Sequence, residues 1–396
     1  MGLRHLGNLV FLDSSSAPTP GGVFSLVAAA PEKVVTGSLE DDAHRALLRE
    51  LLAMQEEAVD LPIPVGGLIG YVDFDGNYTF GLYHDLLVFD HGEGIWWEIG
   101  EISDRLDLFE AIPKAPVAVD FVEGAGREEF IQGVLRAKEY IRSGDIYQVN
   151  IARLCTAPWH EKEDPFTFYS VLREVSPVPY GGYLELGDRR ILSASPECFL
   201  KMSGRSITTR PIKGTRPRFR DPDLDQKSAY DLLTSPKEIA ELVMITDLER
   251  NDLGRICEFG TVRTEEFLKL EQFEQVYHRV STVSGWLRSE IDHLEALRLC
   301  SPGGSISGAP KRRALEIISE LEPHPRGLYT GAIGYLGRNG ESQFSIAIRT
   351  AEIKDGNIRL HVGAGIVADS SPQAEYEETL HKAAGFFRAA ARGLRS

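Results

Sequence analysis

Residues 206–215 have the sequence Ser-Ile-Thr-Thr-Arg-Pro-Ile-Lys-Gly-Thr. The first half is rich in β-branched residues that alternate with others, which predicts a strand. Pro211 cannot donate to a strand ladder and Gly214 permits a turn, so we expect regular pairing to stop here. Lys213 would then lie at a strand end, where the backbone can hold its side chain against a ligand. Such a lysine is either a solvated surface charge or, when desolvated, a nucleophile.

The composition limits the kinds of partner that this chain can have. Its 396 residues are 42% hydrophobic, enough for a sizeable core, and carry a formal net charge of -16. Lys and Arg form no dense run, so we expect no nucleic-acid partner. An acidic surface also repels anions at long range, so an anionic substrate would need local cations or a metal to capture it.

The cysteines and the apolar segments indicate a cytoplasmic protein. Cys155, Cys198, Cys257 and Cys300 are far apart and contain no C-x-x-C pair, so they predict neither a zinc site nor a disulfide framework. We expect them to be reduced thiols. The sequence has no signal peptide and no apolar run long enough to span a membrane, so no membrane partner is expected.

Strand-like and helical patterns are mixed along the chain without regular βαβ alternation. This mixture predicts an α+β fold with large antiparallel sheets. The segment 111–127 contains two prolines and several small residues, and it is interpreted as a connection between two halves. The expected strands are 9–12, 23–27, 66–71, around 96–97, 146–154, 180–186, 191–194, 198–202, 206–209, 273–286, 331–336, 343–353 and 358–362, and the expected helices are 41–58, 130–144, 236–253, near 294, 310–321 and 372–391.

Two of the expected helices begin with Ser-Pro and carry two glutamates three residues apart on one face. The pairs are Glu238 with Glu241 and Glu375 with Glu378, and Lys382 follows on the second face. Acidic residues in a first turn are also favoured by the helix dipole alone, and Glu238 fits a capping box. Two such faces together suit Mg²⁺, which prefers oxygen ligands and completes its shell with water and an anionic substrate.

Two glycine-rich segments precede helices. Residues 301–311 read Ser-Pro-Gly-Gly-Ser-Ile-Ser-Gly-Ala-Pro-Lys, and a turn of this kind before a helix can present amide donors to an anion. The spacing matches neither a Walker A loop nor a dinucleotide fingerprint, and an ordinary tight turn is the alternative. Gly363 and Gly365 lie between a strand and the second glutamate helix, where their backbone could approach a ligand closely.

Five segments together resemble motifs of the chorismate-utilising enzymes, a family that includes anthranilate synthase component I, aminodeoxychorismate synthase component I, isochorismate synthase and salicylate synthase. The segments are Ser-Pro-Glu-Cys-Phe at 195–199, Pro-Ile-Lys-Gly-Thr at 211–215, Asp-Leu-Glu-Arg-Asn-Asp-Leu-Gly-Arg at 247–255, and the runs 302–311 and 363–370. The resemblance implies two large stacked antiparallel β-sheets flanked by helices, with the active site between them near the last helix. Residues 1–120 would form the N-terminal region and residues 121–396 the chorismate-binding catalytic region, packed intimately together or joined as one domain.

Within this family, Lys213 and Gln148 are the informative positions. The resemblance implies that anthranilate, isochorismate and salicylate synthases have alanine where this chain has Lys213, whereas aminodeoxychorismate synthases of the common bacterial type have lysine. Gln148 stands where isochorismate and salicylate synthases carry a water-activating lysine, which favours ammonia as the nucleophile. The implied function is aminodeoxychorismate synthase component I, which makes 4-amino-4-deoxychorismate for 4-aminobenzoate and folate synthesis. Anthranilate synthase component I is the alternative, and a catalytically silent chorismate- or tryptophan-binding regulator is an alternative of another class.

The resemblance also implies roles for individual residues. Glu197 would protonate the leaving 4-hydroxyl group, since a buried glutamic acid can stay protonated near neutral pH. Lys213 would attack C2 and form a covalent amine intermediate, which ammonia resolves at C4. His278 would be the active-site histidine. The implied direct Mg²⁺ ligands are Glu241 and Glu378, with Glu238 and Glu375 acting through water; the implied substrate-binding residues are Arg349, Tyr329, Gly363 and Gly365 around the pyruvyl-ether carboxylate, together with Gly214, Thr215, Ser305, Lys382 and Gln148.

Two partners besides chorismate follow from the resemblance. The chain shows no Cys-His-Glu glutaminase signature, so a separate glutamine amidotransferase subunit would supply the ammonia. The segment Phe11–Ser15 weakly resembles the Leu-Leu-Glu-Ser motif that lines a tryptophan pocket in anthranilate synthases. Whether tryptophan binds in this N-terminal pocket is left open by the sequence.

Overall fold

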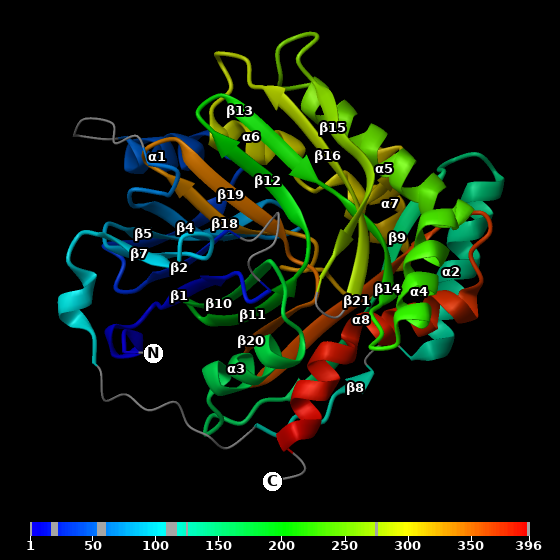
Figure 1. Ribbon diagram of the computed structural model, residues 1–396, viewed down its shortest axis with the longest axis horizontal. Helices are drawn as coiled ribbons and strands as arrows, with labels where there is room; N and C mark the ends of the chain where they lie inside the picture. The colour runs from blue at the N-terminus through cyan, green and yellow to red at the C-terminus, as the bar shows by residue number, and fades with distance from the viewer. Residues whose placement is uncertain are drawn as a thin grey trace.

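The computed structural model describes residues 2–16, 23–53, 61–107, 117–123, 126–273 and 276–393. Two large antiparallel sheets stack face to face, and helices cover their outer faces (Figure 1). The expected α+β class and two-sheet architecture are therefore confirmed. No helix in the described ranges has both the length and the apolar character needed to cross a membrane.

The first sheet contains eleven strands within the described residues, and each neighbouring pair is antiparallel. The order is β17 (Gly308–Ala309), β9 (Gln148–Pro158), β21 (Asn357–Ile366), β20 (Thr350–Lys354), β11 (Arg189–Ser195), β10 (Tyr180–Leu186), β1 (Val10–Asp13), β2 (Phe24–Ala28), β6 (Leu86–Asp90) and β7 (Ile95–Ile99), with β8 (Val122–Glu123) beside β9.

The second sheet contains ten strands of the described chain, also antiparallel. The order is β14 (Ile212–Pro217), β16 (Val276–Trp286), β13 (Ser206–Arg210), β12 (Cys198–Ser203), β19 (Glu341–Ile346), β18 (Ala332–Gly337), β4 (Gly67–Val72), β5 (Asn77–Tyr83) and β3 (Lys33–Ser38), with β15 (Arg263–Gln272) beside β16. Strands from the first 120 residues enter both sheets, since β1 pairs with β10 and β4 pairs with β18. The two expected regions are thus joined through both sheets.

Several helices begin where a side chain caps the first turn. Asp41, Asp164 and Asp221 accept hydrogen bonds from first-turn amides, and Ser235 caps the helix that carries Glu238. The helices are α1 (Asp42–Leu52), α2 (Arg127–Arg142), α3 (Pro165–Val175), α4 (Pro222–Thr234), α5 (Pro236–Gly254), α6 (His293–Cys300), α7 (Lys311–Leu321) and α8 (Pro372–Gly393), and the single turns are η1 (Arg4–Leu6), η2 (Ile102–Arg105) and η3 (Gly304–Ile306).

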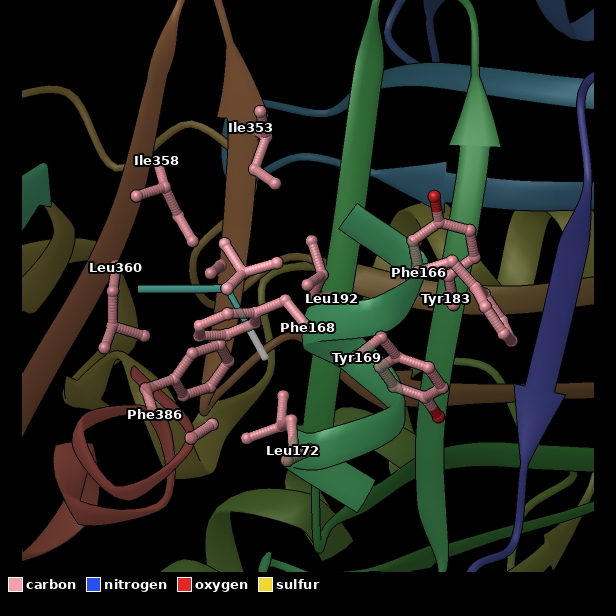
Figure 2. Packing of buried hydrophobic residues seen from close by; sticks show 14 of the residues in the cluster. Phe166, Phe168, Tyr169, Leu172, Tyr183, Leu192, Ile353, Ile358, Leu360 and Phe386 are labelled. Carbon is pink, nitrogen blue, oxygen red and sulfur yellow. The ribbon is translucent and has the colours of Figure 1, made fainter. Parts of the chain in front are cut away.

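The hydrophobic core is layered in the same way as the secondary structure. Leu26 and Leu184 of the first sheet meet Tyr71 and Ile333 of the second sheet between the layers. On the outer face of the first sheet, Phe168 of α3 and Phe386 of α8 stack with ring centroids 6.3 Å apart (Figure 2). Helices α1 and α6 cover the outer face of the second sheet. Apolar burial on three levels therefore fixes the two sheets and α8 relative to one another.

Two of the segments in which the chain passes from one sheet to the other lie side by side. One crossing runs from β11 to β12 through Glu197, and the other runs from β19 to β20 through Arg349. The amide of Ile346 donates to the Glu197 carbonyl at 3.1 Å, and the amide of Ala194 donates to the Arg349 carbonyl at 2.9 Å. The backbone itself therefore places Glu197 and Arg349 near each other at the junction of the sheets.

Several expectations about individual elements were wrong. Pairing does not stop after Pro211, because β14 continues the ladder on β16 with a bulge at Gly214. The single strand expected at 343–353 is two strands in different sheets. Helices α3 and α4 and strand β15 were not expected. The helix expected at 41–58 is α1, and residues 54–60 lie outside the described ranges. Residues 111–116 and 124–125 of the expected connection, and residues 108–110 before it, also lie outside the described ranges.

Replacing Phe386 with alanine tests the packing of α8 on the first sheet. Phe386 is 1% exposed, so truncation leaves a cavity beside Phe168, and we expect the free energy of unfolding in urea to fall by about 3–5 kcal/mol. Phe267→Ala on β15 is the control, since this ring is 54% exposed and its loss should cost less than about 1 kcal/mol. Equal effects of the two substitutions would contradict the packing described here.

Candidate active site

A cavity of about 730 Å³ lies beside the two crossings between the sheets. Strands β14 and β21, turn η3 and the first turns of α5 and α8 complete its wall. Every residue expected in a catalytic, substrate-binding or metal-binding role lines this cavity except Gln148 and Glu375. The lining set is Glu197, Lys213, Gly214, Thr215, Glu238, Glu241, His278, Ser305, Tyr329, Arg349, Gly363, Gly365, Glu378 and Lys382.

Lys213 lies beside a bulge in the pairing of β14 with β16. Lys213 pairs with Arg279 and Thr215 pairs with His278, so Gly214 is the extra residue between two register positions. Gly214 has φ +80°, and a Cβ atom there would lie 2.9 Å from Oε2 of Glu238. Only glycine therefore lets the strand bend here while the first turn of α5 lies directly over it.

The Lys213 amino group lies among the acidic groups of the cavity. Burial raises the pKa of Glu197 and of Glu241, and the charge of Lys213 opposes both shifts. Nζ lies 3.6 Å from where a Cβ of Gly365 would be. No described residue forms a hydrogen bond or an ion pair with Nζ of Lys213. The amine is therefore available to a bound molecule.

Glu197 has the surroundings of a proton donor. It is 6% exposed, and the hydroxyl of Ser305 donates to Oε1 at 2.6 Å. Burial raises the pKa of this carboxyl, while the Ser305 hydrogen bond and the charges of Lys213, Lys382 and Arg349 oppose the rise. A glutamic acid that keeps its proton to higher pH than usual can protonate a leaving group near neutral pH.

Arg349 presents a guanidinium group to the cavity from the second crossing. Its backbone has φ +48°, a left-handed conformation that is costly for a residue with a side chain. Burial lowers its pKa, and the nearby Glu197 carboxyl opposes that shift. Within the described chain the guanidinium makes no hydrogen bond or ion pair. A planar fork of this kind is ready for two-point binding of a carboxylate.

Tyr329 and the glycines of β21 form the wall next to Arg349. Tyr329 is 6% exposed, and a Cβ atom on Gly363 would lie 2.7 Å from its hydroxyl oxygen. His361 stacks on the Tyr329 ring with centroids 5.6 Å apart, and it also lines the cavity. Burial and the Arg326 charge lower the pKa of His361 to about 3, so its ring is neutral. His361 was not selected from the sequence, because a lone histidine in a strand carries no motif.

His278 is a neutral histidine held by the strand opposite it. It is 3% exposed, and Nδ1 lies 3.0 Å from Oγ1 of Thr215 and 3.5 Å from the Gly214 carbonyl oxygen. Burial and, to a lesser extent, the Arg349 charge lower its pKa to about 3. The ring therefore offers hydrogen bonds to a ligand as an uncharged imidazole.

The two glutamate faces meet across the cavity, and two lysines pair with them. Lys237 Nζ lies 3.3 Å from Glu375 Oε1 and 3.8 Å from Glu241 Oε1. Lys382 Nζ lies 2.7 Å from Glu378 Oε1 and donates to the Gly363 carbonyl at 2.9 Å. Lys237 was not selected from the sequence, although it sits between Pro236 and Glu238 at the helix start.

The donor chemistry of these faces fits a hard divalent cation in part. Glu241 Oε1 and Glu375 Oε2 are buried without a hydrogen-bond partner, so each of these two carboxyl groups has one oxygen that no protein donor satisfies. In the described ranges, however, no three acidic, histidine or cysteine side chains converge closely enough to hold a metal ion. Two carboxylates would suffice for Mg²⁺ if water and a substrate anion supplied the remaining ligands.

Gln148 and Glu375 lie just behind the cavity wall. Gln148 is 1% exposed, both of its amide atoms lack a hydrogen-bond partner, and Nε2 lies 3.2 Å from the Cβ position of Gly365. It is therefore adjacent to Lys213 without lining the cavity. Glu375 is 2% exposed and faces Lys237. Their expected roles as a substrate contact and a water-mediated metal ligand stay predictions.

The expected N-terminal tryptophan pocket is a small polar cavity of about 30 Å³ beside Asp13. Its volume has room for a water molecule or two. Arg173 donates to the Asp13 carboxylate at 2.7 Å, and the Tyr169 hydroxyl donates at 3.1 Å, so that carboxylate is already engaged. The sequence left tryptophan binding open, and binding of an amino acid here would require these groups to move.

Comparison with known proteins identifies relatives over nearly the whole chain. Residues 10–388 match the family described as chorismate binding enzyme. Anthranilate synthase component 1 of Streptomyces coelicolor is 47% identical, over 95% of this chain and 83% of that protein. Aminodeoxychorismate synthase component 1 of Bacillus subtilis is 37% identical, over 82% of this chain and 77% of that protein. The crystal structure of anthranilate synthase component I from Streptococcus pneumoniae has a TM-score of 0.81 at 31% identity, over 93% of both chains.

These similarities favour the alternative function over the expected one. Anthranilate synthase component 1 of Thermus thermophilus is another relative, 40% identical over 88% of this chain and 82% of that protein. The named relatives are mostly anthranilate synthases, with one aminodeoxychorismate synthase among them. The expected family is thus confirmed, and the expected product receives weaker support from the relatives than anthranilate does.

Substitution of Gly214 tests whether the bulge shapes the cavity. Gly214→Ala adds a Cβ that meets Leu232 at 2.6 Å and Glu238 at 2.9 Å, at a positive φ. Gly204→Ala is a matched control, because Gly204 also has a positive φ and no atom lies within 4 Å of its Cβ position. We expect Gly214→Ala to lower the free energy of unfolding by about 1–3 kcal/mol more than Gly204→Ala, as measured in urea. Equal losses would mean that the strand and α5 are not in tight contact there.

Proposed function

The chain belongs to the family of chorismate binding enzymes, and on that premise we propose that it is component I of an aminodeoxychorismate synthase. In this proposal it converts chorismate and ammonia into 4-amino-4-deoxychorismate and water. The observation that carries the proposal is the amino group of Lys213, which lines the same cavity as the proton donor Glu197 and has no ion-pair partner there among the described residues. An unpaired amine beside a carboxylic acid suits covalent catalysis of a substitution.

The first step of the proposed mechanism forms the covalent intermediate. The neutral amine of Lys213 attacks C2 of the ring, the double bonds shift, and the bond between C4 and its hydroxyl oxygen breaks. Glu197 gives its proton to the departing oxygen, which leaves as water. The Ser305 hydroxyl donates to Glu197 at 2.6 Å and would stabilise the carboxylate that this step produces.

The second step exchanges the lysine for ammonia. Ammonia attacks C4, the double bonds shift back, and the bond between C2 and the Lys213 nitrogen breaks, so the lysine returns as a neutral amine. The new ammonium group at C4 returns one proton to Glu197. The sum is chorismate plus ammonia giving aminodeoxychorismate plus water, and both groups regain their initial states.

The remaining residues of the cavity would hold the dianionic substrate. Arg349, supported by Tyr329, would bind the pyruvyl carboxylate in two-point geometry. Glu241 and Glu378 would hold Mg²⁺, with Glu238 and Glu375 acting through water, and the ion would neutralise the ring carboxylate. Lys382 would then be released from Glu378 to contact the same carboxylate. Orientation by fixed groups of this kind lowers the entropic cost of both attacks.

A second candidate function is anthranilate synthase component I, and the relatives favour it. In that reaction ammonia itself would attack C2, and Lys213 would be a charged group in the wall instead of a nucleophile. Relatives of both kinds are named component 1, a name that implies a further component. For either product, we propose that a glutamine amidotransferase subunit supplies the ammonia.

The product formed from chorismate separates the two candidates. The purified chain is incubated with chorismate, Mg²⁺ and ammonium, and anthranilate is followed by its fluorescence. We expect no anthranilate, and 4-aminobenzoate only after an aminodeoxychorismate lyase is added. Mass spectrometry of the intact chain should detect a chorismate-derived adduct in the wild type, and Lys213→Ala should abolish it. Lys201→Ala, which removes an exposed lysine of β12, should keep the adduct.

Each other result has a definite meaning. Fluorescent anthranilate without added lyase would establish the second candidate. An adduct that survives Lys213→Ala would show that the nucleophile is wrong. Chorismate binding without any product would identify a binding protein that has no turnover.

Calorimetric titration with Mg²⁺ tests the glutamate faces independently of activity. We expect Glu241→Gln to weaken Mg²⁺ binding at least about tenfold, because a neutral amide replaces a carboxylate ligand. Asp247→Asn on the same helix is the control, since Asp247 is exposed and pairs with Arg250 away from the cavity. Unchanged affinity in Glu241→Gln would place the metal elsewhere.

A further inference from the structure

Helix α5 carries a second pair of acidic side chains at the end opposite Glu241. Glu249 and Asp252 are each 4% exposed, and neither lines the active-site cavity. Both lie against the glycine-rich turn η3, which contributes Ser305 to that cavity. A buried carboxyl pair with no contact to the substrate requires a different role, and its contacts indicate which one.

Glu249 holds the backbone of the turn. The backbone amide of Ser305 faces the Glu249 carboxyl, and the Thr209 hydroxyl lies 3.4 Å from Oε2. A Cβ atom on Gly304 would lie 3.2 Å from Oε1 of Glu249 and 3.1 Å from Cβ of Leu248. The turn therefore packs directly on α5, and the position of its amide depends on this side chain.

Ser305 joins Glu249 to Glu197. Its amide points to Glu249, whereas its hydroxyl donates to Oε1 of Glu197 at 2.6 Å. Asp252 anchors the far end of the same loop, because Lys311 Nζ lies 2.5 Å from its Oδ2 and also donates to the Cys300 carbonyl at 3.3 Å. The loop is thus held at its end and at its centre by one face of α5.

We propose that Glu249 is a positioning residue for the proton donor Glu197 and acts through Ser305; this inference rests on the proposed function. By fixing the Ser305 amide, Glu249 aims the Ser305 hydroxyl at Oε1 of Glu197. The acidic proton of Glu197 then resides on Oε2. When Glu197 releases this proton to the leaving hydroxyl group, the same Ser305 hydrogen bond stabilises the carboxylate.

The charge state of Glu249 supports this role. Burial and, to a lesser extent, the Asp252 charge raise its pKa to about 8, and the Lys311 charge opposes the rise. At neutral pH Glu249 is therefore mostly uncharged, and it does not repel the negative charge that Glu197 acquires. Above pH 8 Glu249 ionises, and its charge would make Glu197 a weaker acid.

A double-mutant cycle with Glu249→Leu and Ser305→Ala tests the coupling. We expect each single change to lower kcat about 10- to 100-fold with KM for chorismate changed less than about threefold, and the double variant to be no slower than the slower single variant. Glu249→Gln keeps an oxygen acceptor, so its kcat at pH 7 should stay within about threefold of the wild type, and its activity should persist to higher pH. Asp247→Asn is the control on the same helix. The proposal would be overturned if the losses in kcat of the two single variants were additive in the double variant. It would also be overturned if Glu249→Gln folded normally but lost as much kcat as Glu249→Leu.

Two measurements without turnover separate this inference from the proposed function. Hydrogen exchange of the peptide that contains Ser305 should be faster in Glu249→Leu than in the wild type. Because the pKa of Glu249 is higher in the folded than in the unfolded chain, this carboxyl stabilises the fold fully at pH values below its unfolded pKa. That contribution is lost as the pH rises through about 8. The Tm of Glu249→Gln should therefore rise relative to the wild type between pH 6 and pH 9. If chorismate gives no product, the proposed function fails alone, whereas unchanged exchange in Glu249→Leu overturns the role of Glu249 whatever the activity.

Discussion

The site depends on two backbone hydrogen bonds between the segments that pass from one sheet to the other. Those bonds join Ile346 to Glu197 and Ala194 to Arg349. Because each segment has one end in each sheet, the stacking of the sheets fixes both segments at once. The packing of the two sheets thereby holds an acid and a guanidinium group near each other, without reliance on a flexible loop. Preorganisation of this kind is what the stabilisation of a charged transition state requires.

Charge balance explains why the same junction can hold an anion on an acidic protein. Four glutamates from two helix starts face the cavity or lie just behind it, and Lys237 and Lys382 pair with three of them. Lys213 and Arg349 carry no such pair in the described chain. The cavity thus has the Arg349 guanidinium and the Lys213 amine free for a bound molecule on one side, and carboxylates that a metal ion could use on the other. The net charge of -16 acts only at long range, where salt screens it.

Most residues that the sequence singled out for a site line one cavity, whereas several strands around that cavity were predicted wrongly. Glycine and glutamate motifs are local patterns, so residues 301–311 and the two Glu-x-x-Glu faces were found without knowing the fold. The bulge at Gly214 was interpreted as the end of a strand, because proline and glycine signal a break whether or not pairing resumes afterwards. The crossing at Arg349 was read as continuous strand, since both of its flanks have strand-like composition. His361 and Glu249 have roles that only their neighbours define, and no spacing in the sequence could identify those neighbours.

Overall similarity and the chemistry of the cavity favour different products, and they measure different things. Identity to the relatives is averaged over the two sheets and their helices, whose packing serves either amination equally well. The position at which nitrogen enters the ring is decided by the few groups that touch C2 and C4. In the proposed mechanism Lys213 is such a group, and its amine lies in the cavity with Glu197 and next to Gly365. An amine that can reach the ring competes with ammonia for C2, and if it wins, ammonia is left with C4. One side chain can thus determine the product while leaving the similarity between the chains almost unchanged.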